Sequence, residues 1–145
     1  MAVLALALLQ ACQPFPRDPE HTLDEAAGAT LHVGATEAPP WLTRAGNGAS
    51  GPEAELVIAF ARSIDARVQW HWGGLDDNLH ALQDHELALV AGGLTAASPW
   101  STHVGFTRPW RVEGETERVL AVPPGENQTL VALERVIESR TGDAP

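Results

Sequence analysis

The sequence predicts an α/β domain, built as a single Rossmann-like lobe with a mostly parallel sheet and helices on both faces. From residue 30 onward, short stretches with strand periodicity alternate with stretches of helical periodicity. The stretch Leu87 to Ala91 is continuously apolar, which is typical of a central parallel strand that is covered on both faces. Right-handed crossovers between such strands give a doubly wound sheet.

The first half of this region supplies two strands and one helix. Residues 30–35 alternate apolar side chains with small or polar ones and predict a strand, which a loop rich in proline and glycine follows. Pro52 suits the first position of a helix, and apolar residues recur at helical spacing over 52–66. Residues 68–72 alternate again and predict the second strand.

The second half continues the alternation. A short helix is expected over 75–82, and the central strand over 87–91 follows it. A short strand is expected near 104–106. A strand over 118–122 and a helix over 128–140 complete the predicted fold.

The N-terminal residues resemble a bacterial lipoprotein signal. Residues 2–11 form an apolar run that is too short to span a bilayer and has the length of a signal-peptide core. The run ends in Leu-Gln-Ala-Cys, which resembles the lipobox, in which the cysteine carries the lipid. We expect a signal peptide over 1–11, lipidation of Cys12 and a tether over 12–29, whose three prolines suit a linker. In the alternative, residues 2–11 form a buried helix and Cys12 is a core thiol.

The composition excludes several classes of function. The chain carries 9 basic and 19 acidic residues, and the net charge of −10 disfavours a nucleic-acid partner. All nine basic residues are arginine, so no lysine is present for a Schiff base or a P-loop. The single cysteine excludes an internal disulfide and a CxxC zinc site. The histidines lack helical metal-ligand spacing and the serines lie in no G-x-S-x-G context, so we expect no metal, no cofactor and no enzymatic activity.

Open α/β sheets bind ligands beyond the carboxyl ends of their strands. In this chain those ends are the loops 37–41, 72–74 and 92–100, and each carries a tryptophan beside glycine or proline. We expect these tryptophans to form a stacking wall, with ordinary packing as the alternative. The candidate ligand-binding residues are Glu37, Trp41, Trp72, Gly93, Thr95 and Trp100.

Four segments in order resemble the first lobe of the bacterial family 3 extracellular solute-binding proteins, which have the type 2 periplasmic binding protein fold. They read LHVGATEAPPW, GPEAELVIAFARSIDARVQW, LHALQDHELALVAGGLT and VGFTRPW, and they run from residue 31 to residue 110. Such proteins deliver amino acids and related polar solutes to ABC importers, and they bind by closing two lobes around the solute.

The resemblance implies roles for particular positions. It places Trp41 in the loop after the first strand, and it places the acidic residue of the first helix at Glu55. It also places Gly93 and Thr95 directly after the third strand. Trp100 departs from the pattern, because amino-acid binders carry at this position the arginine that clamps the ligand carboxylate.

A second departure concerns the length of the chain. Only seven residues, 111–117, separate the end of the last matching segment from the next expected strand. A family member builds its whole second lobe at this point. We therefore expect residues 30–145 to form one lobe, with the second lobe missing between 110 and 118.

These features predict a membrane-anchored lipoprotein of the periplasm or cell surface that binds a small polar solute, such as an amino acid. The solute would pass to an ABC transporter permease for uptake or would be sensed. A single lobe encloses only part of a ligand, so we expect weak, open binding. The alternative is a binding-incompetent remnant whose open face docks a protein partner or a second copy of the chain.

Overall fold

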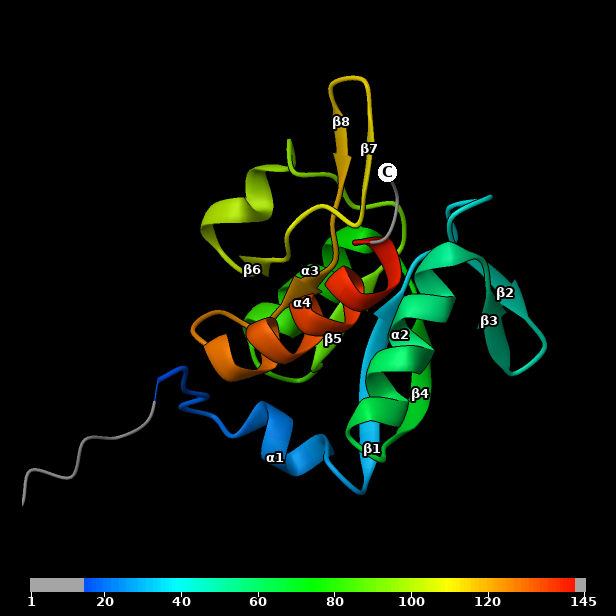
Figure 1. Cartoon of the computed structure of the whole chain (residues 1–145). Coiled ribbons are helices and arrows are strands. Elements are labelled where there is room, and N and C mark those ends of the chain that lie inside the picture. Colours follow the sequence, from blue (N-terminus) through cyan, green and yellow to red (C-terminus); the bar gives the residue numbers. More distant parts are fainter. Residues whose placement is uncertain (1–14, 143–145) are drawn as a thin grey trace, which may run out of the picture.

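The computed structural model describes residues 15–142, and Figure 1 shows their arrangement. The expected signal peptide over 1–11 and the expected lipidation site, Cys12, lie outside the described residues. Between residues 15 and 142, no helix is both long enough and apolar enough to cross a membrane.

The central sheet has five strands in the order β4-β1-β5-β9-β6. Their bounds are β1 (Thr30–Ala35), β4 (Arg67–Trp72), β5 (Leu89–Ala91), β6 (Gly105–Phe106) and β9 (Ala121–Val122). β1 pairs in parallel with β4 and β5, whereas β9 runs antiparallel to β5 and β6. The expected α/β fold with a mostly parallel sheet is confirmed, and β9 is the strand of this sheet that runs against the others.

Helices cover both faces of the sheet. α2 (Pro52–Ser63) and α4 (Asn127–Thr141) pack on one face, where Phe60 and Leu133 join the core that contains Val33 of β1. α3 (Leu75–Gln83) packs on the other face, in a second buried cluster with Val90 of β5. Figure 1 shows α2 and α4 on the near side of the sheet. The two clusters follow from the period of two along a strand, which sends alternate side chains to opposite faces.

Two expected elements are shorter in the structure. The helix predicted over 52–66 ends at Ser63, because Asp65 adopts a left-handed backbone with φ of 56° that a helix cannot continue through. The strand predicted over 118–122 is divided: Arg118 ends a hairpin strand, and β9 begins only at Ala121.

Two hairpins lie outside the sheet. β2 (Thr43–Ala45) and β3 (Gly48–Ser50) pair in the region expected to be a loop. β7 (Arg111–Glu113) and β8 (Thr116–Arg118) form a second antiparallel hairpin, which projects from the body of the molecule in Figure 1. This second hairpin occupies the place in the chain where the second lobe was expected to be missing.

The described part of the expected tether is docked on the domain, which corrects that expectation from residue 18 onward. α1 (Thr22–Ala26) lies within it, and Ala26 is buried. The Asp18 carboxylate accepts hydrogen bonds from the amide and hydroxyl of Thr129, at 2.9 and 2.5 Å. The Glu126 carboxylate accepts a hydrogen bond from the amide of Thr22 at 3.1 Å. The composition of this segment predicted a linker, because hydrogen bonds to residues more than 100 positions away, at the start of α4, leave no pattern in the local sequence.

Candidate functional site

The carboxyl ends of β1, β4 and β5 lie side by side, and hydrogen bonds tie together the loops that leave them. Asn78 of α3 donates from Nδ2 to the carbonyl oxygen of Ala35 at 3.1 Å. Thr36 donates from Oγ1 to the carbonyl oxygen of Gly73 at 2.9 Å, and from its amide to that of Ala91 at 3.1 Å. The three strand ends therefore form one fixed border, which we name the strand-end edge.

Trp41 is half-buried in the loop after β1. An antiparallel bridge between Ala38 and Leu42 closes this loop, and Leu42 is fully buried. The Trp41 ring meets the ring of Trp110 edge-on, with centroids 5.8 Å apart. The guanidinium carbon of Arg118 lies 3.9 Å from the centroid of the Trp41 ring. A second indole and a cation therefore hold Trp41 in place.

Thr95 lies directly opposite Arg118 in an isolated antiparallel bridge. The amide of Ala96 donates to the carbonyl of Glu117 at 2.9 Å, and the amide of Val119 donates to the carbonyl of Leu94 at 3.0 Å. These two bonds flank the Thr95 and Arg118 pair rather than join it, which is the arrangement in which opposed side chains approach most closely. The bridge thus places Thr95 and Arg118 on the same side of the backbone, and Arg118 reaches Trp41.

Glu53 is fully buried at the start of α2, beneath this group. Its Oε2 accepts a hydrogen bond from the amide of Gly93 at 3.0 Å, and its own amide donates to the carbonyl of Trp41 at 3.1 Å. Burial raises the pKa of Glu53, while the Gly93 amide and the positive charge of Arg118 act in the opposite direction. The amide of Gly93, expected to face a ligand, is therefore engaged inside the protein.

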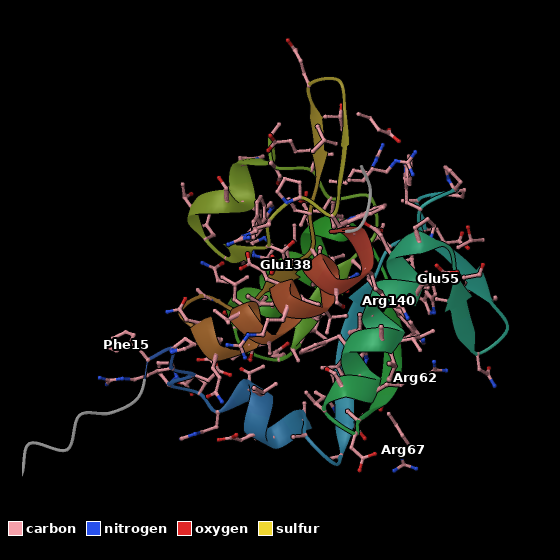
Figure 2. The ribbon with its side chains drawn as sticks, viewed as in Figure 1. Phe15, Glu55, Arg62, Arg67, Glu138 and Arg140 are labelled. Carbon is pink, nitrogen blue, oxygen red and sulfur yellow. The ribbon has the colours of Figure 1, made fainter. Side chains whose placement is uncertain are left out.

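Glu53 was not among the expected site residues, although helical spacing points to it. Positions 53, 56, 57 and 60 share one face of α2, and the other three are buried apolar residues. The resemblance instead pointed to Glu55, which is exposed and is labelled beside α2 in Figure 2.

Glu37 and Trp72 lie together in a separate shallow groove of about 400 Å³ at the strand-end edge. The residues that line it are Thr36, Glu37, Arg44, Trp72 and Gly73. Arg44 contacts both residues. Its backbone amide donates to Glu37 Oε1 at 3.2 Å, and its guanidinium carbon lies 5.7 Å from the centroid of the Trp72 ring. Arg44 belongs to the unexpected β2-β3 hairpin, so sequence reasoning did not single it out.

Trp100 lies apart from the other two candidate tryptophans. Its indole Nε1 donates to Asp76 Oδ1 at 3.1 Å, and its ring meets the ring of His80 edge-on at 4.6 Å. Across residues 15–142, no ring contact joins any two of Trp41, Trp72 and Trp100. The expected continuous stacking wall is therefore absent there, since each tryptophan has its own partners.

The six candidate residues therefore fall into three places. Trp41 and Thr95 lie beside Arg118, and Gly93 belongs to the same place through Glu53, whose backbone amide binds the Trp41 carbonyl. Glu37 and Trp72 line the groove with Arg44, and Trp100 packs on α3. Among the residues that the structure describes, no group of three histidine, cysteine, aspartate or glutamate residues could hold a metal ion. Arg118, Arg44 and Glu53 are the charged groups that the structure adds.

No protein-family model matches the sequence, and no curated protein matches it. Several solved structures are similar in fold. A single-residue mutant of the arginine-bound form of domain 1 from TmArgBP has 19% sequence identity and a TM-score of 0.75, and the match covers 83% of this chain and 98% of that chain.

Two further structures are of the ancestral protein AncCDT-1. One, described as an ancestral cationic amino acid solute-binding protein, has 27% identity and a TM-score of 0.57, over 62% of this chain and 41% of that chain. The other, described as an amino-acid-binding precursor of cyclohexadienyl dehydratase, has 15% identity and a TM-score of 0.73, over 84% of this chain and 94% of that chain. The nearly complete coverage of a domain 1 is consistent with a single lobe.

Proposed function

We propose that this chain, which has the fold of one lobe of an amino-acid-binding solute-binding protein, binds an amino acid or a related small polar solute at its strand-end edge. The observation that carries the proposal is the group formed by Trp41, Arg118 and Thr95. There an aromatic ring, a cation and a hydroxyl side chain meet beside the ends of three strands.

The chemistry of this group suits a small zwitterion. Ligand sites combine flat apolar surface with a few polar groups that fix the orientation of the ligand. Trp41 supplies the flat surface, and Thr95 and Arg118 supply a hydroxyl and a guanidinium on one side of it. The position of the group agrees with the general rule that open α/β sheets bind ligands beyond the carboxyl ends of their strands.

The comparisons support binding by a single lobe. Two of the similar structures are described as arginine-bound forms of a domain 1, and the matches cover 98% and 92% of those chains. A second lobe is therefore not required for a domain of this fold to be found with an amino acid. A single lobe leaves one side of the ligand in water, so we propose that affinity is low and that release is fast.

The proposed role is binding without catalysis. One neighbour is described as a precursor of cyclohexadienyl dehydratase, which connects this fold with catalysis in another protein. In this chain, Glu53 is a fully buried carboxyl group whose Oε2 accepts from the amide of Gly93 and whose Oε1 has no hydrogen-bond partner among the described residues. We also propose attachment to the membrane through Cys12, and delivery of the solute to an ABC transporter permease or to a sensor.

The experiment is a thermal-shift screen of the full chain against amino acids, polyamines, sugars and small carboxylates, at two protein concentrations. A ligand at 100 times its dissociation constant should stabilise the domain by about 2.7 kcal/mol, which is a shift of several degrees for this size. We expect a shift with amino acids that Trp41→Ala removes and Trp100→Phe retains, since Trp100 has its own partners. Absence of any shift, with melting that rises with protein concentration, would favour the self-associating module instead.

A further inference from the structure

The strand-end edge has no arginine at position 100, where the amino-acid binders that the sequence resembles carry one. Trp100 stands there in place of the clamping arginine, and its indole is turned toward Asp76 and His80 of α3. An amino acid still carries a carboxylate, and an anion bound beside apolar surface needs a charged donor. Another arginine at this edge must supply the charge if the proposed solute is an amino acid.

Arg118 has the geometry for that task. Its side chain is 15% exposed, and its Nε is buried without a hydrogen-bond partner among the described residues. Its Nε lies 3.8 Å from Glu113 Oε2, too far for a hydrogen bond, because Glu113 is held by Arg111 at 2.6 Å. A buried donor without a partner is costly, and Arg118 Nε is such a donor. A carboxylate placed against this edge of the guanidinium would accept from Nε and from one terminal nitrogen.

The surroundings of Arg118 also restrict where such a carboxylate lies. The Trp41 ring is 3.9 Å from the guanidinium carbon, so stacking holds the planar donor group against the indole. Thr95 is opposite Arg118 in the bridge and brings its hydroxyl to the same side. The carboxylate of Glu53 is buried at the start of α2, where its Oε2 accepts from the Gly93 amide and its Oε1 has no hydrogen-bond partner among the described residues.

We propose that Arg118 binds the carboxylate of the solute through its guanidinium, with the Thr95 hydroxyl as a second donor and Trp41 as the platform that orients Arg118. This inference rests on the proposed function, since it names the group that recognises an amino acid at that site. Arg118 is the last residue of β8. The β7-β8 hairpin, which stands in place of a second lobe, therefore supplies through Arg118 the positive charge that Trp100 does not supply.

Arg44 is a weaker candidate for the same task. It is exposed, its guanidinium carbon lies farther from its tryptophan, at 5.7 Å, and the carboxylate of Glu37 is bound to its amide. A carboxylate in that groove would meet the negative charge of Glu37. Arg118 also has an acidic neighbour, since Glu113 Oε2 lies 3.8 Å from its Nε, but no hydrogen bond joins the two, and its guanidinium lies closer to its tryptophan.

The test compares two probes that differ only at the carboxyl group, L-arginine and L-argininamide, by titration calorimetry with the full chain. We expect the unmodified chain to bind L-arginine at least about tenfold more tightly than L-argininamide. Arg118→Gln should weaken L-arginine binding by at least about tenfold and leave the L-argininamide affinity within about twofold. Arg118→Lys should keep part of the preference, because it keeps the charge and loses the planar pair of donors.

Arg67→Gln is the matched control, since Arg67 is exposed and begins β4, at the end of that strand opposite to the strand-end edge. It should leave both affinities within about twofold of the unmodified chain. Circular dichroism and melting temperature verify that each variant is folded. If Arg118→Gln binds L-arginine as tightly as the unmodified chain does, or weakens both probes equally, the carboxylate role is wrong while the proposed function stands. If the unmodified chain binds neither these probes nor any member of the solute panel, the proposed function fails and this inference fails with it.

Discussion

The guanidinium carbon of Arg118 lies 3.9 Å from the centre of the Trp41 ring, although 77 positions separate the two residues in the chain. Trp41 follows the first strand, and Arg118 ends the hairpin that takes the place of a second lobe. The contact therefore joins the aromatic loop after β1, which was expected to be part of the site, to the β7-β8 hairpin, which was expected only as a short connection.

This contact should be measurable as a coupling energy. A double-mutant cycle with Trp41→Leu and Arg118→Gln should give a coupling of about 0.5–2 kcal/mol in the free energy of unfolding, as expected for a largely desolvated cation over an indole. The same cycle with Arg111→Gln should give less, because Arg111 is 5.2 Å from the ring and more exposed. If the changes in the free energy of unfolding caused by Trp41→Leu and Arg118→Gln add within about 0.3 kcal/mol, the contact between the two side chains does not stabilise the fold.

The buried carboxyl group of Glu53 should impose a pH dependence on stability. Its pKa is raised above the usual value of 4.5, chiefly by burial, so the folded chain holds this proton more tightly than the unfolded chain does. Its contribution to the free energy of unfolding is fully present below the unfolded pKa and is lost as pH rises through the higher folded pKa. Urea titrations from about pH 4 to about pH 8 should show this decline in the unmodified chain but not in Glu53→Gln. If the free energy of unfolding changes with pH in the same way for the unmodified chain and for Glu53→Gln, the raised pKa of Glu53 is wrong.

The backbone that carries Trp41 should depend on the glycine at the start of α2. Gly51 has φ of 107°, and a Cβ there would lie 2.5 Å from the carbonyl oxygen of Trp41. Gly51→Ala should therefore destabilise the fold by about 2 kcal/mol or more and should weaken solute binding. Gly46→Ala is the matched control, because Gly46 also has a positive φ, of 57°, but open space around its Cβ. Equal melting temperatures of the two variants would show that the contact with Trp41 does not matter.

The docking of the N-terminal segment should contribute to stability through Asp18. Its carboxylate satisfies the amide and hydroxyl of Thr129 in the first turn of α4. Asp18→Ala leaves these donors without that acceptor and should cost about 1–3 kcal/mol in the free energy of unfolding, measured by urea titration. Asp24→Ala, at an exposed position of α1, should change it by less than about 0.5 kcal/mol. If the two variants are equally stable, residues 18–29 act as the free tether that their composition suggested.

The order of the main strands and helices could be predicted from the sequence because periodicity reports which side of an element is buried. Alternation over 30–35 and helical spacing after Pro52 correspond to β1 and α2. Periodicity does not report strand direction, so β9 was expected to join a parallel sheet and instead runs antiparallel to its neighbours. The β7-β8 hairpin, which precedes β9 in the chain, is mostly exposed and carries no apolar pattern that could have predicted it.

The candidate site could be predicted in part. The rule for strand ends selected Trp41, Thr95, Glu37 and Trp72, and the structure places all four at the strand-end edge. The cations beside them were not selected, because Arg44 and Arg118 come from hairpins whose long-range contacts leave no local signal. Trp100 was selected by its place in a loop, and its hydrogen bond to Asp76 explains why it lies elsewhere.

The most direct test of the central claim is a calorimetric titration of the full chain with L-arginine, repeated with Trp41→Ala. Solute binding at the strand-end edge predicts a saturable 1:1 heat for the unmodified chain and an affinity at least about tenfold lower for Trp41→Ala, because the variant loses the aromatic surface and the support of Arg118. Saturable binding that Trp41→Ala leaves unchanged would contradict the location of the site. The absence of saturable heat with L-arginine, and with every other amino acid of the panel, would contradict solute binding itself.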